Sequence, residues 1–172
     1  MPTTRAKLTR LIAFDVDGVM TDGGLYFSDS GEEFKRFNSL DGHGIKMLRA
    51  TGVEVAIITG RTSRCVEARA KNLGITHVYQ GAEHKLDAMV DLLNKLKLSR
   101  DVAAYMGDDV VDLTVMRHVG LAISVPESPA LVHTHSHYVT KRAGGHGAVR
   151  EACEFIMSSQ GTLDKQLAPY LR

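Results

Sequence analysis

The chain has 172 residues, with 21 Lys and Arg against 20 Asp and Glu, so its length predicts one folded domain over residues 1–172 and its charge is nearly balanced. Such a balance provides no excess of positive charge for binding nucleic acid or an anionic membrane. No stretch approaches the ~18 apolar residues of a membrane span. Two isolated cysteines and the absence of a signal peptide before the first strand predict a protein of the reducing cytoplasm.

The first strand is predicted over residues 11–14, an apolar run that reads as buried on both faces. It ends in Asp15-Val16-Asp17-Gly18. Two carboxylates at the edge of a core are costly without a counter-ion, so this turn suggests a hard divalent cation such as Mg²⁺. Taken alone, it is equally consistent with an ordinary turn in which Asp15 and Asp17 cap backbone amides.

A β-hairpin is predicted next, over about residues 23–37. A polar turn, Asp29-Ser30-Gly31, separates two arms that carry four aromatic side chains. A two-stranded ribbon is marginal in water, so the hairpin needs a partner surface. Because exposed aromatics of this number mark contacts, we expect another subunit to cover it.

Helices and strands alternate over the rest of the chain. Further strands are predicted at 54–58, 75–80, 102–106, 121–124 and 138–140. Helices are predicted from about residue 45 to Gly52, through Val66 and Leu73 up to Gly74, over 85–96, through Val111 to Met116, shortly after Pro129, and from 148 to about 159. This alternation predicts an α/β fold, a Rossmann-like parallel sheet with helices on both faces and ligands at the carboxyl ends of the strands. The tail, residues 161–172, has no clear periodicity, which leaves a flexible segment open.

Four groups of polar residues leave strand ends or helix starts and are candidates for one site. They are Asp15 and Asp17; Thr59, Gly60 and Arg61; Lys85; and Asp108, Asp109 and Asp112. Each group taken alone could be structural: a helix cap, a turn or a charge exposed to solvent. In this order on an alternating chain, they together indicate phosphoryl transfer.

Each residue type has a role in that chemistry. A carboxylate such as Asp15 attacks phosphorus and becomes an aspartyl phosphate. Asp17 protonates the departing oxygen and then deprotonates water, while Thr59 and Lys85 hold the phosphoryl oxygens. Mg²⁺ held by Asp15, Asp108 and the backbone carbonyl of Asp17 would neutralise the repulsion between these anions. Gly18 and Gly60 leave room for the phosphate.

These motifs resemble the four motifs of the haloacid dehalogenase-like hydrolases. The matching residues are Asp15 and Asp17, Thr59 to Arg61, Lys85, and Asp108 to Asp112, which span about 100 residues. The resemblance implies a phosphatase, because dehalogenase-type members lack the second aspartate, Asp17. It also implies the roles of nucleophile, acid–base residue and Mg²⁺ ligand at these positions.

A narrower resemblance covers nearly the whole chain. The hairpin in place of a large cap, residues 37–45 and the Gly144-Gly145-His146-Gly147 segment are similar to the family of capless 3-deoxy-D-manno-octulosonate 8-phosphate phosphatases. This implies a phosphorylated sugar-acid substrate, a cytoplasmic role in lipopolysaccharide biosynthesis and a homotetramer with hairpins at the interface. Arg61 and Arg69 would suit the carboxylate of the sugar acid or a tail from the next subunit, although Arg69 is equally consistent with a solvent-facing helix charge.

Other functions stay open at this point. One is a phosphatase of a nine-carbon sugar acid 9-phosphate, which would share all four motifs. Others are a phospho-aspartate receiver domain, in which the acidic residues have a different order, and a silent oligomerisation module. Three histidines occupy alternate positions, His133, His135 and His137, and could bind zinc. No acidic or thiol partner lies nearby in the sequence, so a polar edge or a subunit contact is favoured.

Overall fold

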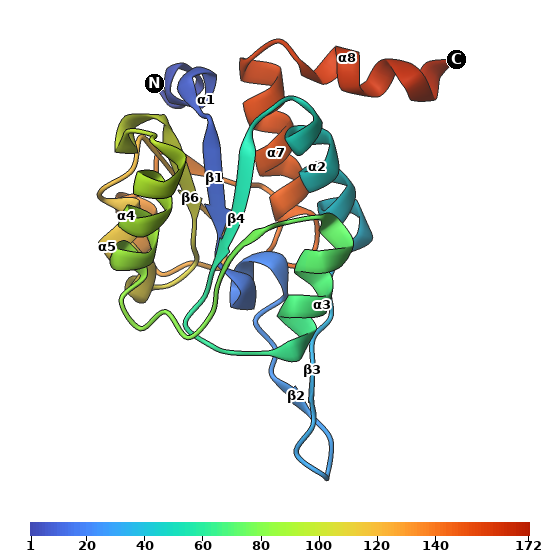
Figure 1. Ribbon diagram of the computed structural model, residues 1–172, viewed down its shortest axis with the longest axis vertical. Helices are drawn as coiled ribbons and strands as arrows, with labels where there is room; N and C mark the ends of the chain where they lie inside the picture. The colour runs from blue at the N-terminus through green and yellow to red at the C-terminus, as the bar shows by residue number, and fades with distance from the viewer.

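The computed structural model describes residues 1–172, and a six-stranded parallel sheet forms its centre (Figure 1). The strand order is β5-β4-β1-β6-β7-β8, so β1 lies inside the sheet between β4 and β6. The strands are β1 (Leu11–Phe14), β4 (Glu54–Ile58), β5 (His77–Tyr79), β6 (Ala103–Met106), β7 (Leu121–Ser124) and β8 (Tyr138–Val139). The parallel α/β sheet predicted from the alternation is confirmed.

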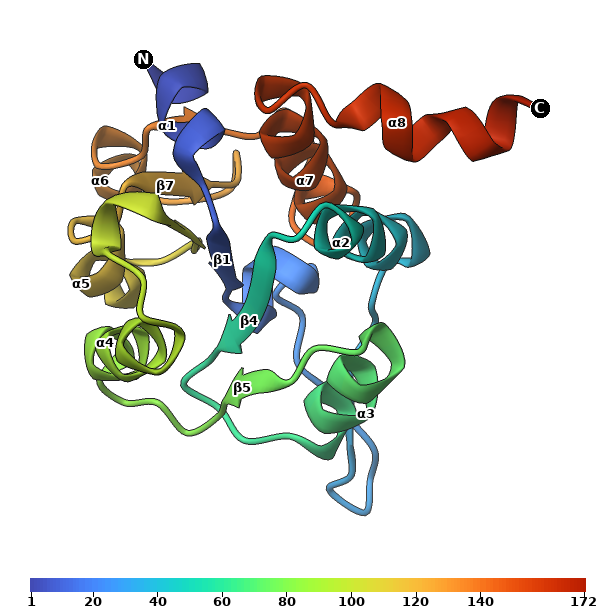
Figure 2. The ribbon, with the colours of Figure 1, turned by 45° about the horizontal axis from the view of Figure 1, so that its top comes forward.

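Helices cover both faces of the sheet (Figure 2). One face carries α2 (Ser39–Ala50), α3 (Arg64–Leu73) and α7 (Ala148–Ser159); the other carries α4 (Lys85–Leu96), α5 (Leu113–Met116) and α6 (Ala130–Thr134). Single-turn helices η1 (Val16–Met20), η2 (Arg100–Val102) and η3 (Val110–Asp112) connect elements. None of the helices combines the length and hydropathy that crossing a bilayer requires.

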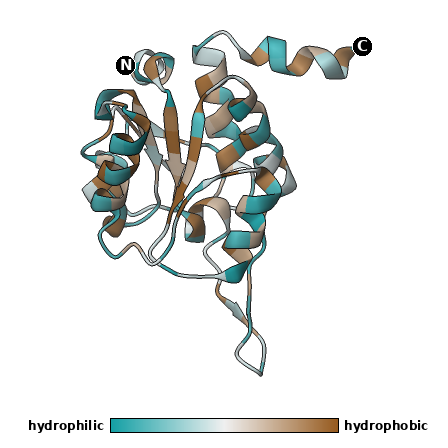
Figure 3. Cartoon of the chain, viewed as in Figure 1, coloured by the Kyte–Doolittle hydropathy of each residue, from teal (hydrophilic) through white to brown (hydrophobic).

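The alternation of side chains along β1 explains this layering. Ile12 and Phe14 belong to a cluster of 27 buried residues on the face of α2, α3 and α7. Leu11 and Ala13 point the other way, into a cluster of 14. Because both faces are buried, the central strands are mostly apolar, as the brown in Figure 3 shows. A polar residue can therefore sit only at the strand end.

Three local expectations differ from the structure. The chain does not run straight into β1 but first forms α1 (Pro2–Leu8), which has proline at its first position and buries Ala6. Helix α2 begins at Ser39, earlier than expected, because Asn38 accepts from two backbone amides there. The tail forms α8 (Leu163–Leu167) and η4 (Ala168–Leu171), since Leu163 and Leu167, one turn apart, pack against the core.

A two-stranded ribbon projects from the body of the molecule (Figure 1). It consists of β2 (Tyr26–Phe27) and β3 (Glu33–Phe34), which are antiparallel with Tyr26 opposite Phe34. Tyr26, Phe27 and Phe34 are 44%, 57% and 54% exposed. Within one chain, these aromatic side chains therefore lack a covering surface.

Candidate active site

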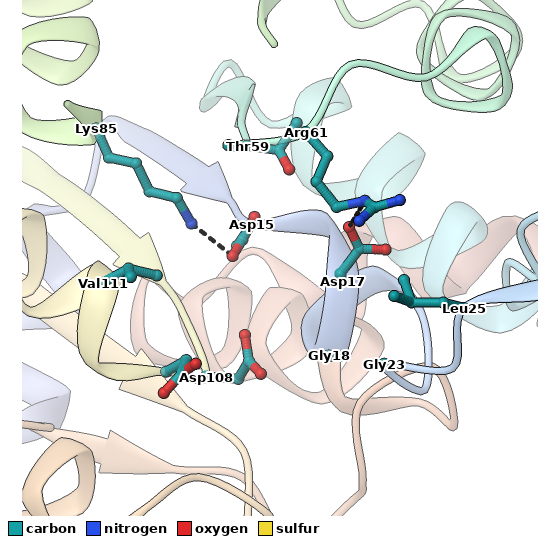
Figure 4. A pocket seen from close by; sticks show the side chains of 12 residues that line it. Asp15, Asp17, Gly18, Gly23, Leu25, Thr59, Arg61, Lys85, Asp108 and Val111 are labelled. Carbon is teal, nitrogen blue, oxygen red and sulfur yellow. Dashed lines mark hydrogen bonds and ion pairs between the residues drawn. The ribbon is translucent and has the colours of Figure 1, made fainter. Parts of the chain in front are cut away.

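The carboxyl ends of β1, β4 and β6 open into a polar cavity of about 350 Å³ (Figure 4). Parallel strands end at one edge of the sheet, so residues far apart in sequence meet there. The lining residues are Asp15, Asp17, Gly18, Gly23, Leu25, Thr59, Gly60, Arg61, Lys85, Asp108, Asp109 and Val111. The cavity thus contains every candidate predicted from the four groups except Asp112, which lies beneath it.

Lys85 lies between two buried carboxylates in the cavity floor. Its Nζ donates to Oδ2 of Asp15 at 2.6 Å and to Oδ1 of Asp112 at 2.7 Å. Burial, followed by the charge of Asp112, raises the pKa of Asp15 to about 6. Burial alone would lower the pKa of Lys85, but the charges of Asp15 and Asp112 raise it above the usual lysine value. Lys85 is therefore a charged donor held against Asp15.

Asp112 is held in place on both of its oxygens. Oδ1 accepts from Lys85 and, at 2.7 Å, from the hydroxyl of the fully buried Tyr105, while Oδ2 accepts from the backbone amides of Asp108 and Asp109 at 3.0 and 3.1 Å. Asp112 therefore orients Lys85 and the acidic turn. Sequence reasoning missed Tyr105, because a tyrosine inside an apolar strand is typical of a core.

Asp108 faces Asp15 across the cavity. Carboxylate oxygens of Asp15, Asp108 and Asp112 lie within 4.8 Å of one another. Burial and the charges of Asp112 and Asp15 raise the pKa of Asp108 to about 7. Gly18 has a φ of 83°, and a Cβ there would collide with Oδ2 of Asp108. Glycine at this position lets the turn after β1 approach Asp108.

The turn after β4 forms the opposite wall. The amide of buried Thr59 donates to the carbonyl of Tyr79 at 2.9 Å, and the Thr59 carbonyl accepts from Ala82 at 3.0 Å. A Cβ at Gly60 would meet nothing closer than the Ala82 carbonyl at 4.0 Å, so internal packing does not demand glycine there. The Arg61 side chain is 46% exposed at the cavity mouth.

Asp17 points away from the acidic cluster, toward Arg61 (Figure 4). Its Oδ1 accepts from Nζ of Lys35 at 2.5 Å, and its Oδ2 lies 3.7 Å from Nε of Arg61. Sequence reasoning missed Lys35. The signal was present, since Glu33, Lys35 and Phe37 alternate with more exposed residues along the hairpin arm, which places all three on one side.

Arg69 is not among the residues that line this cavity in one chain, so its role as a substrate ligand stays a prediction. Its Nη2 donates to the carbonyl of Asn38 at 2.9 Å, its Nη1 lies 3.3 Å from Oδ1 of Asn72, and its guanidinium lies 5.7 Å from the ring centre of Phe37. Within one chain, Arg69 therefore fastens the start of α2 to α3. The solvent-facing alternative is too simple, because burial lowers the pKa of Arg69.

Two of the three alternating histidines, His133 and His137, make contacts with backbone groups. Nε2 of His133 lies 2.9 Å from the carbonyl of Val125, and Nδ1 of His137 accepts from the amide of Ala122 at 2.9 Å. These contacts connect α6, and the segment that precedes β8, with β7 and the residue after it. Histidines in such contacts are consistent with a polar edge.

Comparison with known proteins decides the family. The model of the haloacid dehalogenase-like hydrolases matches residues 74–151. The chain is 48% identical over 161 residues to the 3-deoxy-D-manno-octulosonate 8-phosphate phosphatase KdsC of Escherichia coli K12, covering 94% of this chain and 86% of that one. The chain belongs to the haloacid dehalogenase-like hydrolases. The resemblance predicted from the four motifs is thus confirmed.

Solved structures of other haloacid dehalogenase-like hydrolases superimpose along almost the whole chain. A probable YrbI family phosphatase of Pseudomonas syringae has a TM-score of 0.97 at 50% identity, covering 99% of this chain and 97% of that one. The 3-deoxy-D-manno-octulosonate 8-phosphate phosphatase of Moraxella catarrhalis has a TM-score of 0.96 at 43% identity, covering 98% and 97%. That structure holds a magnesium ion, a phosphate ion and a KDO molecule.

Proposed function

We propose that this hydrolase is a Mg²⁺-dependent phosphatase that converts 3-deoxy-D-manno-octulosonate 8-phosphate to the free sugar acid and inorganic phosphate, in the cytoplasm and as a step of lipopolysaccharide biosynthesis. The names of its relatives support the substrate. One observation carries the chemistry: the carboxylate of Asp15 lies in a polar cavity between Lys85 and Asp108. A nucleophile and a second acid from two strand ends thus converge with an ammonium group from the start of α4.

The reaction proceeds in two displacements. An oxygen of Asp15 forms a bond to phosphorus while the bond from phosphorus to the sugar oxygen breaks, and that oxygen takes the electron pair and a proton from Asp17. Asp17 then accepts a proton from water as the water oxygen attacks phosphorus, which releases phosphate and restores Asp15. Lys85, Thr59 and the amides near Gly60 hold the equatorial oxygens, and Arg61 at the mouth pairs with the substrate carboxylate.

The acidic cluster fits a divalent cation. Three carboxylates within 4.8 Å are costly without one, and Lys85 offsets only Asp15 and Asp112. Asp112 is saturated by donors, so Asp15, Asp108 and the backbone carbonyl of Asp17 are the proposed ligands. The carboxylate of Asp17 faces Lys35 and is left free to act in proton transfer. When bound, Mg²⁺ supplies charge neutralisation for the attack of one anion on another.

A phosphate-release assay tests the function. The eight-carbon sugar acid 8-phosphate should have the highest kcat/KM among sugar phosphates, and chelation of Mg²⁺ should lower the rate by about 10³-fold, because charge stabilisation by a metal is worth several kcal/mol. A higher kcat/KM on a nine-carbon 9-phosphate would transfer the proposal to that substrate. Release from none of these esters would contradict it.

We extend the proposal to a homotetramer whose hairpins meet at the interface. The exposed Tyr26, Phe27 and Phe34 support it, because one ribbon of two-residue strands is marginal alone and lacks a covering surface. The proposal leaves open whether the tail enters a neighbouring subunit.

Light scattering tests the assembly. The wild type should have four times the mass of one chain, and joint replacement Phe27→Ser with Phe34→Ser should yield smaller species, since two apolar contacts per chain are lost. Val90→Ser removes an apolar side chain of similar exposure from α4 and should leave the mass unchanged. A monomeric wild type would reject the tetramer.

The two alternatives from other classes are weaker. Family membership excludes the receiver domain, because the relatives over nearly the whole chain are phosphatases. A silent module would not need Asp15, Lys85 and Asp108 around one cavity. Their convergence supports an active enzyme.

A further inference from the structure

The base of the hairpin contributes a buried charge to the edge of the active site. Lys35 follows β3 directly, and its side chain is only 2% exposed although it ends in an ammonium group. The extended arm turns Glu33 and Lys35 to one side and Phe34 to the other. Burying a lysine costs hydration and up to ~2 kcal/mol of side-chain entropy, so its partners must compensate.

Those partners form a closed ring of four alternating charges. Nζ of Lys35 lies 2.5 Å from Oδ1 of Asp17 and 3.1 Å from Oε1 of Glu33. The same Glu33 oxygen lies 3.1 Å from Nη2 of Arg61, whose Nε lies 3.7 Å from Oδ2 of Asp17. Each carboxylate therefore lies between two cations, and the ring joins the hairpin to both walls of the cavity.

The two cations do not hold Asp17 equally. Arg61 is 46% exposed and its contact is 3.7 Å long, beyond hydrogen-bond distance. Lys35 is buried and directly hydrogen-bonded. Arg61 is thus available to a substrate, whereas the Lys35 ammonium is buried between Asp17 and Glu33. The orientation of the Asp17 carboxylate depends chiefly on Lys35.

We propose that Lys35 is a positioning residue for Asp17: the hairpin supplies an ammonium group that holds the Asp17 carboxyl group at the cavity edge, where its protonated form gives a proton to the departing sugar oxygen and its carboxylate form takes one back from water. This inference rests on the proposed function. It adds a role in positioning an acid–base residue to a hairpin whose exposed aromatic residues we propose to lie at a subunit interface. A lysine that merely fastens the hairpin would show the same contacts, so the test must separate the two roles.

The leaving group provides that separation. When Asp15 attacks a sugar phosphate, the bond from phosphorus to oxygen breaks and the poor alkoxide leaving group needs the proton of Asp17. A p-nitrophenolate needs none, because its charge is delocalised. Since kcat/KM reports the steps up to the first irreversible bond cleavage, it isolates this proton transfer from the later attack of water.

Lys35→Met is the informative variant, because it keeps the apolar stem and removes the charge. We expect kcat/KM on the sugar 8-phosphate to fall by about 10- to 100-fold, the range expected when a general acid is misplaced, and kcat/KM on p-nitrophenyl phosphate to change less than about threefold. The ratio of kcat/KM on the sugar 8-phosphate to kcat/KM on p-nitrophenyl phosphate should therefore fall in Lys35→Met, and Lys35→Arg should recover part of it. Arg36→Met removes the exposed cation next along the arm and should leave the ratio unchanged.

A double-mutant cycle with Asp17→Asn makes the result decisive. If Lys35 acts through Asp17, Lys35→Met should have little further effect in the Asp17→Asn background. Equal losses on both esters, additive losses in the cycle, or wild-type kinetics of Lys35→Met would each overturn the inference. If Lys35→Met does not fold, as thermal unfolding would show, Lys35→Gln takes its place, since it keeps a donor at that depth.

Failure of the proposed function is recognised separately. A wild type that does not hydrolyse the eight-carbon 8-phosphate rejects that substrate, and the same comparison is then made on whichever alkyl phosphate the wild type hydrolyses best. Absence of leaving-group dependence in Asp17→Asn itself would reject the role of Asp17, before any statement about Lys35.

Discussion

Replacing Asp15 with asparagine should lower kcat by about 10⁴-fold or more, since loss of a nucleophile removes the covalent pathway and leaves only binding and charge effects. The amide has the same shape and can still accept from the amide of Val16, as Oδ1 of Asp15 does at 2.7 Å. The backbone turn after β1 should therefore persist. Steady-state phosphate release gives the rate, and the thermal midpoint shows that the variant is folded.

The covalent intermediate gives a second readout of the same variant. Wild-type protein quenched during turnover should carry one phosphoryl group on the peptide that contains Asp15, and the variant should carry none. Asp87→Asn is the matched control, because Asp87 is an exposed aspartate of α4 only two residues from Lys85, and it should retain both the rate and the label. A variant at Asp15 that retained about one-hundredth of kcat or more would not fit a nucleophile.

Replacing Lys85 with methionine should destabilise the fold by on the order of 3–5 kcal/mol, the usual cost of removing one partner of a buried ion pair. Lys85 is 5% exposed and is the cation between Asp15 and Asp112, so the variant leaves two buried carboxylates facing each other. The free energy of unfolding in urea, measured with a chelator present, gives the loss. The variant should also lower kcat by about 10²–10³-fold, as removal of one oxyanion donor does.

Added Mg²⁺ should restore part of the stability of this variant, because a cation bound at Asp15 and Asp108 would offset the charge that Lys85 no longer offsets. Lys95→Met is the control on the same helix. Lys95 is 60% exposed and pairs with Asp91 at the surface, so its loss should change stability far less. Equal stability of the two variants in chelator would show that Lys85 does not stabilise the acidic pair.

The proposed coupling between the hairpin and Asp17 connects assembly with catalysis. If neighbouring subunits cover Phe27 and Phe34, they also restrain the arm that carries Glu33 and Lys35. The oligomer would then contribute part of the order of the active site. The prediction for Lys35 can be tested without assuming this link.

Much of the fold could be predicted from the local pattern of apolar and polar residues. Runs such as residues 11–14 and 55–58 are apolar throughout because parallel strands are buried on both faces, and the helices between the strands each have one apolar face. The elements that sequence reasoning missed, α1 and α8, are short and contribute few apolar side chains. Periodicity is weak over five to seven residues, so packing against the core decides them.

The sequence by itself determined which polar groups gather at one edge of the sheet, since Asp15, Thr59 and Asp108 each follow a parallel strand and such strands end at a common edge. Only the tertiary structure decided which partner each one has. Lys35 reaches Asp17 across 18 positions, Tyr105 supports Asp112 from inside an apolar strand, and Arg69 binds the carbonyl of Asn38 instead of lining the cavity. The physical reason is that the position of each strand, and the residue that follows it, is encoded in the local pattern of apolar residues, whereas the partner of a charged side chain depends on which groups the folded chain buries within its reach.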